Sequence, residues 1–592
     1  MHLEAFSAYP LEIVTQMKTI SAFFKNPIVW IFLLALVLRI YKLDKYPYGF
    51  HVDEVNVAWN AQSILKTGHD DHGNFLSLYY NSFGDFRPTG IFYITIPSLI
   101  LFGRSEFATR FPVALFGAMT VFPIYLLVEL LDENKKRGIK NINTGYLAGF
   151  LLAISPWHIE LSRATNEVIP SAFFALISLF LFIKLIKTQK YKFGILSIIT
   201  IVFSYLFYHS IRFLAPLIFI ITFFYFVKEV KNRRIKIWAW LCIISTLLLT
   251  SLFSINKEGL ARFNQVSIFK SIDTEYEIQR IKNENFTINP LTIIFDSRYV
   301  VYSKQFINEY AKYFSGGFLI GSSGRPYRFS TPGTGLITYI EIALLIVGLI
   351  EVAKGKKNLL LLLLLLLIAP IPAAITIEDS PNLSRAFFML PFLISLEAYG
   401  LKSVLMSSSK YKNQIIFTIF SLLILNFLYF DHMYFKHSLS HRPFLTDYFV
   451  DSPTYRDVGA KELSLQLDIL KQKYDKIIIT NFPDNPYPWY AFFTNKDPAD
   501  FNKTFNLKTK ERTYDNIIFS QEKCPTDNDL LKYNKENILM IDSWECPFLS
   551  QISDKTPLKI VGSIGRPDGS GIYTFLERDW SKPLIINGVT IN

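Results

Sequence analysis

The sequence predicts a polytopic α-helical membrane protein of about eleven spans, followed by a C-terminal soluble α/β domain. Of the 592 residues, 51% are hydrophobic and only 19% are charged, a composition that does not suit a soluble globule. Apolar runs such as residues 26–43 and 358–377 approach the roughly 20 residues that a spanning helix needs. After residue 430 the sequence becomes polar, with short β-rich runs.

Apolar runs define the candidate spans, with boundaries placed to within a few residues. The spans are 27–43, 107–131, 144–160, 166–187, 191–208, 211–228, 236–255, 335–353, 358–377, 385–404 and 413–430. No small-residue cleavage site follows the first run, so we expect it to remain as an anchor. The run 91–103 is short for a span and contains Pro97, and we expect an interfacial helix there.

The charges of the loops support this assignment of the spans. If 91–103 does not span, five basic loops fall on the side of the N-terminus: DENKKRGIKNIN, KTQKYK, KEVKNRRIK, KGKKN and SSSKYKN. The positive-inside rule places such loops in the cytoplasm, so the net charge of +12 is not read as nucleic-acid binding. The predicted location is the cytoplasmic (plasma) membrane, with the N-terminus inside. Loops 44–106 and 256–334 and the C-terminal domain are expected outside.

The predicted domains are a transmembrane module, residues 1–430, and an extracytoplasmic α/β domain, residues 431–592. In the second domain, SPTYRDVGAKELSLQLDILKQ predicts an amphipathic helix with Pro453 at its first position. The runs KIIIT, NIIFS, NILMI, LKIVGSI and GIYTFL predict strands. An extracytoplasmic location would allow a disulfide between Cys524 and Cys546, and the sequence leaves the pairing open.

Acidic residues gather just after the first span. Asp53 and Glu54 are expected in the first turn of a short helix, because apolar residues recur behind them at helical spacing. Acids are common there because they favour the helix dipole, and for the pair alone this explanation outweighs catalysis. The loop also carries His51, Asp70, Asp71, His72, Asp85 and Arg87. Ionisable residues in such number at a membrane surface are more typical of a functional site.

Basic side chains occur at the predicted outer ends of spans. They are Arg163, His209, Arg212 and Arg385. Guanidinium forks match phosphate oxygens, although a single arginine serves equally well as an interfacial anchor. Together the acids and arginines suggest that a lipid-linked phosphosugar is held by its phosphate while a carboxylate deprotonates an acceptor hydroxyl. Because phosphate is already a good leaving group, one base suffices for an inverting displacement.

The segments VDEVNVAWNAQSILKTGHDDHG, SFGDFRPTGIFYI, GRSEFATRFP, SPWHIELSR and RFNQVSIF resemble those of polyprenyl-phosphate-sugar-dependent GT-C glycosyltransferases. The chain is most similar to the bacterial branch of the dolichyl-phosphate-mannose–protein mannosyltransferase family, with lipid A aminoarabinose transferases as cousins. The resemblance covers roughly residues 25–400. It implies that Asp53 is the general base and that Glu54 supports it. It also matches the family's outer-loop acids to Asp70 and Asp85, and its Ser-Arg motif to Ser162 and Arg163.

Two departures from the family limit this inference. Eukaryotic members carry a β-trefoil domain in the large outer loop, and residues 256–334 are too few for one. Some lipid A-modifying members bind a metal near the site. Here His51, Asp70 and His72 show no recognisable ligand spacing, so no cofactor is predicted and a divalent metal is left open.

The predicted activity is that of an inverting hexosyl- or pentosyltransferase acting outside the membrane. Its partners are a polyprenyl-phosphate-linked sugar, a protein, lipid or glycan acceptor and membrane lipid, with no nucleic acid. Asp53 and Glu54 are the predicted catalytic residues. The predicted substrate-binding residues are Asp70, Asp85, Arg87, Arg163, His209, Arg212 and Arg385. The first choices for the donor phosphate are Arg163, Arg212 and Arg385, in that order.

Other interpretations of the sequence remain open. GRPYRFSTPGTG (324–335) is either a lid over the site or an ordinary surface loop. A transporter or flippase of lipid-linked glycans would place its ionisable residues near mid-membrane and show repeats, and the sequence shows neither. A polymerase or ligase of such glycans would not need an Asp-Glu pair directly after the first span.

Overall fold

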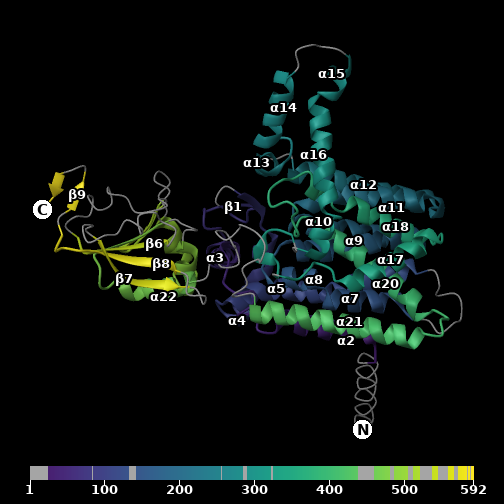
Figure 1. Cartoon of the computed structure of the whole chain (residues 1–592), viewed down its shortest axis with the longest axis horizontal. Coiled ribbons are helices and arrows are strands. Elements are labelled where there is room, and N and C mark those ends of the chain that lie inside the picture. Colours follow the sequence, from purple (N-terminus) through teal and green to yellow (C-terminus); the bar gives the residue numbers. More distant parts are fainter. Residues whose placement is uncertain are drawn as a thin grey trace, which may run out of the picture. The chain divides into compact units, whose positions relative to one another are not determined.

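The computed structural model describes residues 25–82, 85–132, 142–254, 257–284, 290–321, 324–331, 333–437, 459–480, 486–504, 511–520, 536–543, 558–565, 571–582, 584–586 and 589–591. The chain forms two compact units (Figure 1). The first comprises residues 1–41, 113–325 and 333–431. The second comprises residues 42–112, 326–332 and 432–592, so it includes the loop after the first span, which the sequence analysis assigned to the transmembrane module.

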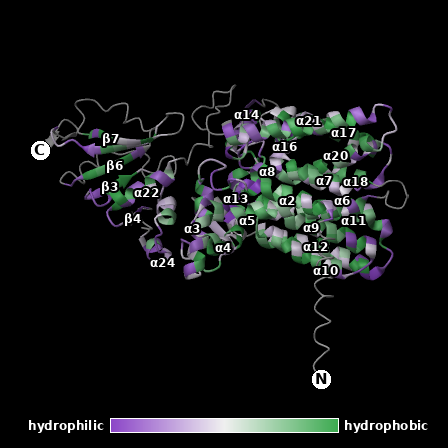
Figure 2. Ribbon diagram, turned by 90° about the horizontal axis from the view of Figure 1, so that it is seen from below, coloured by the Kyte–Doolittle hydropathy of each residue, from purple (hydrophilic) through white to green (hydrophobic). Residues whose placement is uncertain are grey.

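The apolar runs form a helical bundle. Its helices are α2 (Pro27–Ile40), α5 (Glu106–Met119), α6 (Val121–Leu131), α7 (Thr144–Ile154), α8 (Pro156–Arg163), α9 (Val168–Thr188), α10 (Lys192–Tyr205), α11 (Ser210–Phe226), α12 (Arg233–Ser254), α17 (Tyr339–Ala353), α18 (Lys357–Ile368), α19 (Ile371–Ala374), α20 (Leu390–Leu405) and α21 (Lys412–His432). Hydrophobic residues dominate these helices (Figure 2). Each predicted span contains a helix, and seven segments of the described chain are long and apolar enough to cross a membrane. The total of eleven spans stays a prediction.

The predicted span 144–160 is not a continuous helix. The run 144–160 is broken into α7 and α8, because Ser155 adopts an extended backbone with φ −62° and ψ 122°. Pro156 follows at the first position of α8. Proline disfavours helical geometry in the residue before it and lacks the N–H that a continuing helix requires. The apolar pattern of the run conceals this break.

Close helix packing depends on glycine in one part of the bundle. α17 and α20 approach so closely that a Cβ on Gly348 would collide with the carbonyl oxygen of Leu396. A Cβ on Gly400 would collide in the same way with the carbonyl oxygen of Leu344. Small residues at helix contacts are typical of membrane bundles, where packing replaces the hydrophobic effect as the driving force between helices.

The long segment between α12 and α17 is helical rather than irregular. It contains α13 (Lys257–Val266), α14 (Ile272–Glu284), α15 (Pro290–Phe295) and α16 (Arg298–Lys312). A π-helical turn at Gly317–Gly321 and a 3-10 turn at Tyr327–Phe329 follow. In Figure 1, α14 and α16 lie side by side and project from the bundle as an arm.

The second unit is built on a six-stranded sheet of order β4-β5-β3-β6-β8-β7. The strands are β3 (Lys476–Ile479), β4 (Arg512–Tyr514), β5 (Ile517–Phe519), β6 (Ile538–Ser543), β7 (Leu558–Gly565) and β8 (Gly571–Arg578). A separate hairpin pairs β9 (Leu584–Ile586) with β10 (Val589–Ile591). β3 pairs in parallel with β5 and β6, and the remaining pairs are antiparallel. All five predicted strand runs form strands, and β4, β9 and β10 were not predicted.

Helices pack on this sheet. They are α22 (Ala460–Leu470), α23 (Tyr487–Phe493) and α24 (Pro498–Phe501). α22 begins at Ala460, after Gly459 with φ 92°, and the predicted first residue Pro453 lies outside the described residues. The two cysteines named as a disulfide pair also lie outside them. α23 was not predicted, because its seven residues are too few to show a helical period.

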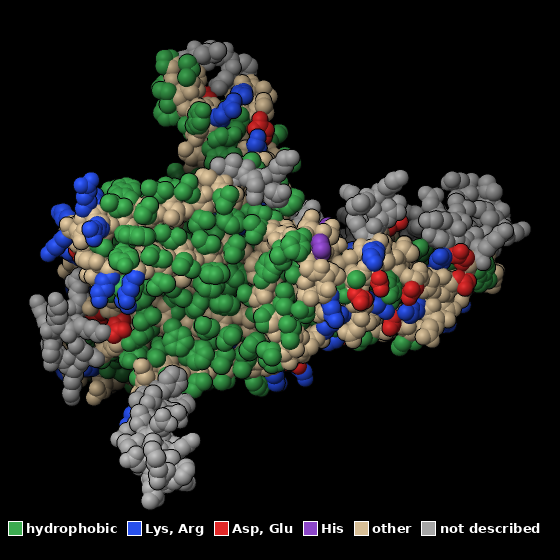
Figure 3. Space-filling view, turned by 180° about the vertical axis from the view of Figure 1, so that it is seen from behind, with side chains coloured by type: hydrophobic (Ala, Val, Ile, Leu, Met, Phe, Trp, Pro, Cys, Tyr) green, Lys and Arg blue, Asp and Glu red, His purple; other side chains and the backbone are tan. Residues whose placement is uncertain are grey.

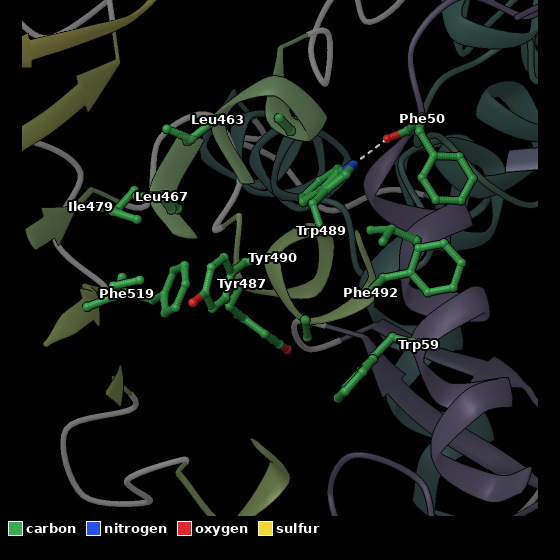
Figure 4. Packing of buried hydrophobic residues seen from close by; sticks show 14 of the residues in the cluster. Phe50, Trp59, Leu463, Leu467, Ile479, Tyr487, Trp489, Tyr490, Phe492 and Phe519 are labelled. Atoms are coloured by element: carbon green, nitrogen blue, oxygen red, sulfur yellow. Dashed lines mark hydrogen bonds between the residues drawn. The ribbon is translucent and has the colours of Figure 1, made fainter. Parts of the chain in front are cut away.

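The loop after the first span belongs to the same core as the sheet. It contains α3 (Val52–Thr67), a hairpin of β1 (Tyr79–Ser82) and β2 (Asp85–Pro88), and α4 (Gly90–Phe102). The predicted helix at 91–103 is confirmed, and its interfacial position stays a prediction. Phe50 and Trp59 join one buried cluster with residues of α22, α23 and β3 (Figure 4). The indole N–H of Trp489 donates to the Phe50 carbonyl at 2.7 Å, which fixes the entry to α3.

Candidate active site

The carboxylate of Asp53 lies between two arginines. Arg87 Nη1 lies 2.9 Å from Asp53 Oδ1, and Arg328 Nη2 donates to Asp53 Oδ2 at 3.0 Å. Each oxygen therefore has its own guanidinium. The three side chains keep contact with solvent, with 14% of Asp53, 28% of Arg87 and 22% of Arg328 exposed. The group is thus partly enclosed and still accessible to a ligand.

Local sequence places Asp53 at this position. His51 is the N-cap of α3, and its Nδ1 accepts the backbone N–H of Asp53 at 3.1 Å. Glu54 completes a capping box, because its side chain accepts the backbone N–H of His51. Asp53 and Glu54 therefore occupy the first helical turn, as predicted. Arg87 comes from β2, and Arg328 comes from the 3-10 turn Tyr327–Phe329.

The two arginines also set the charge state of the site. Burial raises the pKa of the Asp53 carboxyl, and the charges of Arg87, His51 and Arg328 together outweigh burial. The pKa of Asp53 therefore lies well below its usual range, and the group is ionised at neutral pH. Arg328 also places its guanidinium over the ring of Phe329, 4.8 Å from the centroid. An ionised carboxylate between two partly exposed guanidinium groups is an arrangement that a phosphate can disturb.

Glu54 is fixed in a different way. It accepts two hydrogen bonds from Arg110, from Nε at 2.9 Å and from Nη2 at 2.7 Å. Only 5% of the Glu54 side chain and 1% of the Arg110 side chain are exposed. Arg110 also donates to the carbonyls of Leu43 and Gly49. This buried pair therefore joins the start of α3 to the chain that leads into it, which suits the supporting role expected for Glu54.

Asp70 stabilises its own turn. Its carboxylate accepts the backbone N–H groups of His72 and Asn74 and the hydroxyl of Ser77. It also accepts both hydrogen bonds of the Asn74 amide group. These interactions stabilise the Asp70 carboxylate in its buried position. They give it a turn-forming role that does not require substrate.

Asp71 and His72 form an adjacent pair. His72 Nδ1 lies 2.6 Å from Asp71 Oδ1, and the Tyr80 hydroxyl donates to Asp71 Oδ2 at 3.3 Å. Burial lowers the pKa of His72, and the hydrogen bond and charge of Asp71 outweigh burial, so the pKa is raised. Ligand atoms of Asp70, Asp71 and His72 lie within 4.8 Å of one another, which is close enough for a metal ion. His51, proposed as a ligand from the sequence, is not in this group.

The other predicted arginines belong to the first unit. Arg163 donates to the carbonyls of Leu38 and Tyr41 at 2.9 and 2.7 Å. Arg212 donates to the carbonyls of Tyr205 and Phe253 at 3.1 and 3.2 Å. Both arginines are almost fully buried. These contacts tie together helix ends, and they describe anchors within the bundle.

The remaining predicted residues also have local partners. His209 Nδ1 lies 3.0 Å from Nη1 of Arg212. Arg385 donates to the Glu378 carbonyl at 2.7 Å and forms an ion pair with its carboxylate. Asp85 opens β2 opposite Ser82, and the structure does not describe its side chain. The roles assigned to all these residues stay predictions.

Two residues of the site were missed in the sequence. Arg328 lies 275 positions from Asp53, in the segment interpreted either as a lid over the site or as an ordinary surface loop. Arg110 lies in GRSEFATRFP, where an arginine in an apolar segment near a span end is usually an anchor. An unpaired arginine beside an acidic loop was a weak signal for either residue. Their pairing depends on tertiary structure.

Comparison with known proteins finds a family match that begins at Arg87. Residues 87–255 match the family model described as dolichyl-phosphate-mannose-protein mannosyltransferase. An uncharacterized protein of Aquifex aeolicus (strain VF5) is 26% identical over 250 residues, which cover 41% of this chain and 47% of the relative. The chain thus matches less than half the length of this curated relative.

Two solved structures are also similar to this chain. ArnT from Cupriavidus metallidurans in the apo state gives a TM-score of 0.46 at 12% identity, covering 92% of this chain and 97% of that chain. The oligosaccharyltransferase AglB from Archaeoglobus fulgidus, in complex with an inhibitory peptide and a dolichol-phosphate, gives 0.44 at 13%, covering 79% and 63%. Over residues 87–255, this chain is therefore similar to the family described as dolichyl-phosphate-mannose-protein mannosyltransferase.

Proposed function

We propose that this protein is an inverting glycosyltransferase that moves a sugar from a polyprenyl-phosphate carrier to an acceptor hydroxyl on the outer face of the cytoplasmic membrane. The observation that carries the proposal is the Asp53 carboxylate held between Arg87 and Arg328. It supplies a base and two phosphate-binding forks within one partly exposed group. The match to a family named for a lipid-phosphate sugar donor supports the class of substrate.

Donor binding would activate the base. With both arginines on its oxygens, the Asp53 carboxylate is a weak base, because its pKa lies well below the usual range. The phosphate of the donor offers the arginines competing oxygens. When Arg87 and Arg328 turn toward it, Asp53 loses the interactions that depress its pKa. The base therefore becomes effective only when the donor is in place.

The reaction then proceeds as a single displacement. The acceptor oxygen attacks the anomeric carbon and forms the new C–O bond, while its proton passes to the Asp53 carboxylate. The bond between the anomeric carbon and the phosphate oxygen breaks, and the polyprenyl phosphate leaves with the electron pair. Arg87 and Arg328 stabilise the charge that develops on that oxygen. Attack from the face opposite the phosphate inverts the anomeric centre.

Glu54 supports this chemistry indirectly. Its paired hydrogen bonds with Arg110 hold the first turn of α3 against residues 43–49. The main chain that carries Asp53 is therefore fixed, while its side chain keeps partial contact with solvent. Glu54 is a positioning residue in this proposal.

A transfer assay in reconstituted membranes tests the proposal. Polyprenyl-phosphate sugars are offered with a cell-envelope extract to the wild type and to Asp53→Asn, which keeps the shape and removes the base. We expect transfer to fall by about 10²–10⁴-fold. The matched control is Asp500→Asn, since Asp500 is an exposed acid on α24 with 78% of its side chain exposed. Equal transfer by wild type and Asp53→Asn would disprove the mechanism. The labelled product identifies the acceptor.

A further inference from the structure

The arm formed by α14, α15 and α16 carries an apolar surface with no neighbour among the described residues of the first unit. Its most exposed large apolar side chains on α15 and α16 are Leu291, Ile293, Ile294, Phe295, Tyr299 and Ile307, between 58% and 74% exposed. α15 has the sequence PLTIIF, without a charged residue. A continuous apolar surface of this kind marks a contact with a lipid or a protein.

The root of the arm lies at one end of the bundle. The Tyr310 hydroxyl donates to the Leu367 carbonyl at 2.6 Å, in the last turn of α18. α18 begins at Lys357, beside the basic loop 354–357. The Tyr313 hydroxyl accepts the backbone N–H of Asn382, just before α20. The arm therefore leaves the bundle at the end opposite that basic loop, where a spanning helix meets the membrane surface.

The direction of the arm matches a membrane surface. In Figure 1, α14 and α16 run roughly perpendicular to the long helix α21 of the same unit. A segment that starts at the end of a span and runs perpendicular to it stays at one depth. That depth is the boundary between lipid headgroups and acyl chains.

Charge is distributed across the arm in the corresponding way. α15 carries no charge, whereas the charged residues of the arm lie on α14 and α16. They are Asp273, Glu275, Glu277, Arg280, Lys282 and Glu284 on α14, and Arg298, Lys304, Glu309 and Lys312 on α16. In Figure 3 the hydrophobic side chains of the arm lie on its left side, toward the end of the bundle where Lys and Arg gather. The charged side chains lie on the opposite side. The apolar side of the arm therefore faces toward the hydrophobic surface of the bundle, which lipid covers in the membrane. The charged side of the arm faces away from that surface.

We propose that α14, α15 and α16 form an interfacial arm whose α15 tip inserts into the bilayer of the membrane that the bundle spans. Lipid covers the apolar surface of the arm, because this surface lies at the same depth in the bilayer as the hydrophobic surface of the bundle. A partner protein would bind the same surface only by displacing that lipid. The inference does not depend on the proposed reaction.

Spin labelling in nanodiscs tests the arm directly. The three native cysteines Cys242, Cys524 and Cys546 are replaced by alanine, and a nitroxide is attached to Ile294→Cys. Ile293→Cys provides a second reading if the first variant does not fold. The water-side control is Glu275→Cys on α14, and the lipid-side control is Leu425→Cys, since Leu425 is 60% exposed on α21. Nanodiscs contain phosphatidylethanolamine and phosphatidylglycerol.

Collision rates with oxygen and with a water-soluble nickel chelate distinguish the environments. We expect labels at 293 and 294 to resemble the label at 425, with oxygen access several-fold above nickel access, and the label at 275 to show the reverse. Nickel access at 294 equal to that at 275 would place the tip in water and overturn the proposal. Exclusion of both reagents at 294 would mean that protein covers the tip, and this would also overturn it.

Discussion

Two groups of arginines in this chain have different surroundings. Arg87 and Arg328 meet a carboxylate and keep more than a fifth of their side chains exposed. Arg163 and Arg212 meet backbone carbonyls and are almost fully buried. For Arg87 and Arg328, a phosphate can replace the carboxylate as hydrogen-bond acceptor. If Arg163 or Arg212 turned to a phosphate instead, backbone carbonyls would lose their donors. The comparison therefore favours Arg87 and Arg328, rather than the arginines first chosen from the sequence, as the binders of donor phosphate.

The largest effect is expected where an enclosed arginine has an enclosed acid. Arg110→Met would leave the Glu54 carboxylate buried without its cation. Breaking a buried pair in this way costs about 3–5 kcal/mol of stability. Thermal unfolding in detergent, compared with the wild type, measures the loss. A change in stability below about 1 kcal/mol would show that Glu54 finds water or another partner. It would contradict a stabilising role for the buried pair of Arg110 and Glu54.

A smaller effect, on activity rather than stability, is expected for an exposed arginine. Arg328→Ala removes one guanidinium from Asp53 and from the donor phosphate. We expect transfer to fall by about 10²–10³-fold, the usual result of losing one charge-stabilising donor. Unfolding should change little. If transfer is normal and stability falls, Arg328 belongs with the anchors.

Removal of an anchoring arginine should have the opposite profile. Arg212→Met leaves the carbonyls of Tyr205 and Phe253 without their donor. Each unsatisfied buried carbonyl costs about 1–3 kcal/mol. The unfolding temperature should drop, while the KM for the lipid-linked donor in the folded fraction stays at the wild-type value. A raised donor KM with unchanged stability would restore Arg212 as a phosphate ligand.

The smallest effect is a pH dependence at His72. Asp71 raises the pKa of His72, so the protonated pair is favoured in the folded state. Its contribution is complete below the unfolded pKa of about 6.5 and is lost as the pH rises through the higher folded pKa. Because 39% of the side chain is exposed, we expect less than about 1 kcal/mol. Unfolding of wild type and His72→Gln at pH 5 and pH 9 measures it. A difference that grows with pH would contradict the sign.

The sequence predicted those features that depend on local pattern. Long apolar runs have few structural solutions in a membrane, which is why every predicted span contains a helix. The strands around Ile477, Ile517 and Leu539 were visible as short β-branched and apolar runs. The start of α3 at Val52 followed from its acidic first turn. Such signals lie within a few residues of the structure that they predict.

Features that depend on distant partners were not predicted. One local feature was also missed, the break at Ser155 before Pro156, because the apolar pattern of the run conceals it. The pairing of Asp53 with Arg328 and of Glu54 with Arg110 joins segments that share no sequence pattern. The packing of Trp489 against Phe50 likewise placed the first outer loop in the sheet-containing unit. The sequence offers several compatible partners for each of these contacts, and only the folded structure shows which residues pair.

The distance in sequence between Asp53 and Arg328 has a consequence for biosynthesis. The ribosome makes the carboxylate 275 residues before the second of its two cations. A nascent chain that has released α3 and the β1–β2 hairpin therefore holds Asp53 with Arg87 alone. Under the proposed mechanism, such a chain cannot bind the donor phosphate with both guanidinium groups. Catalytic competence then arises only after most of the bundle has been synthesised, which protects the cell from premature sugar transfer by unfinished chains.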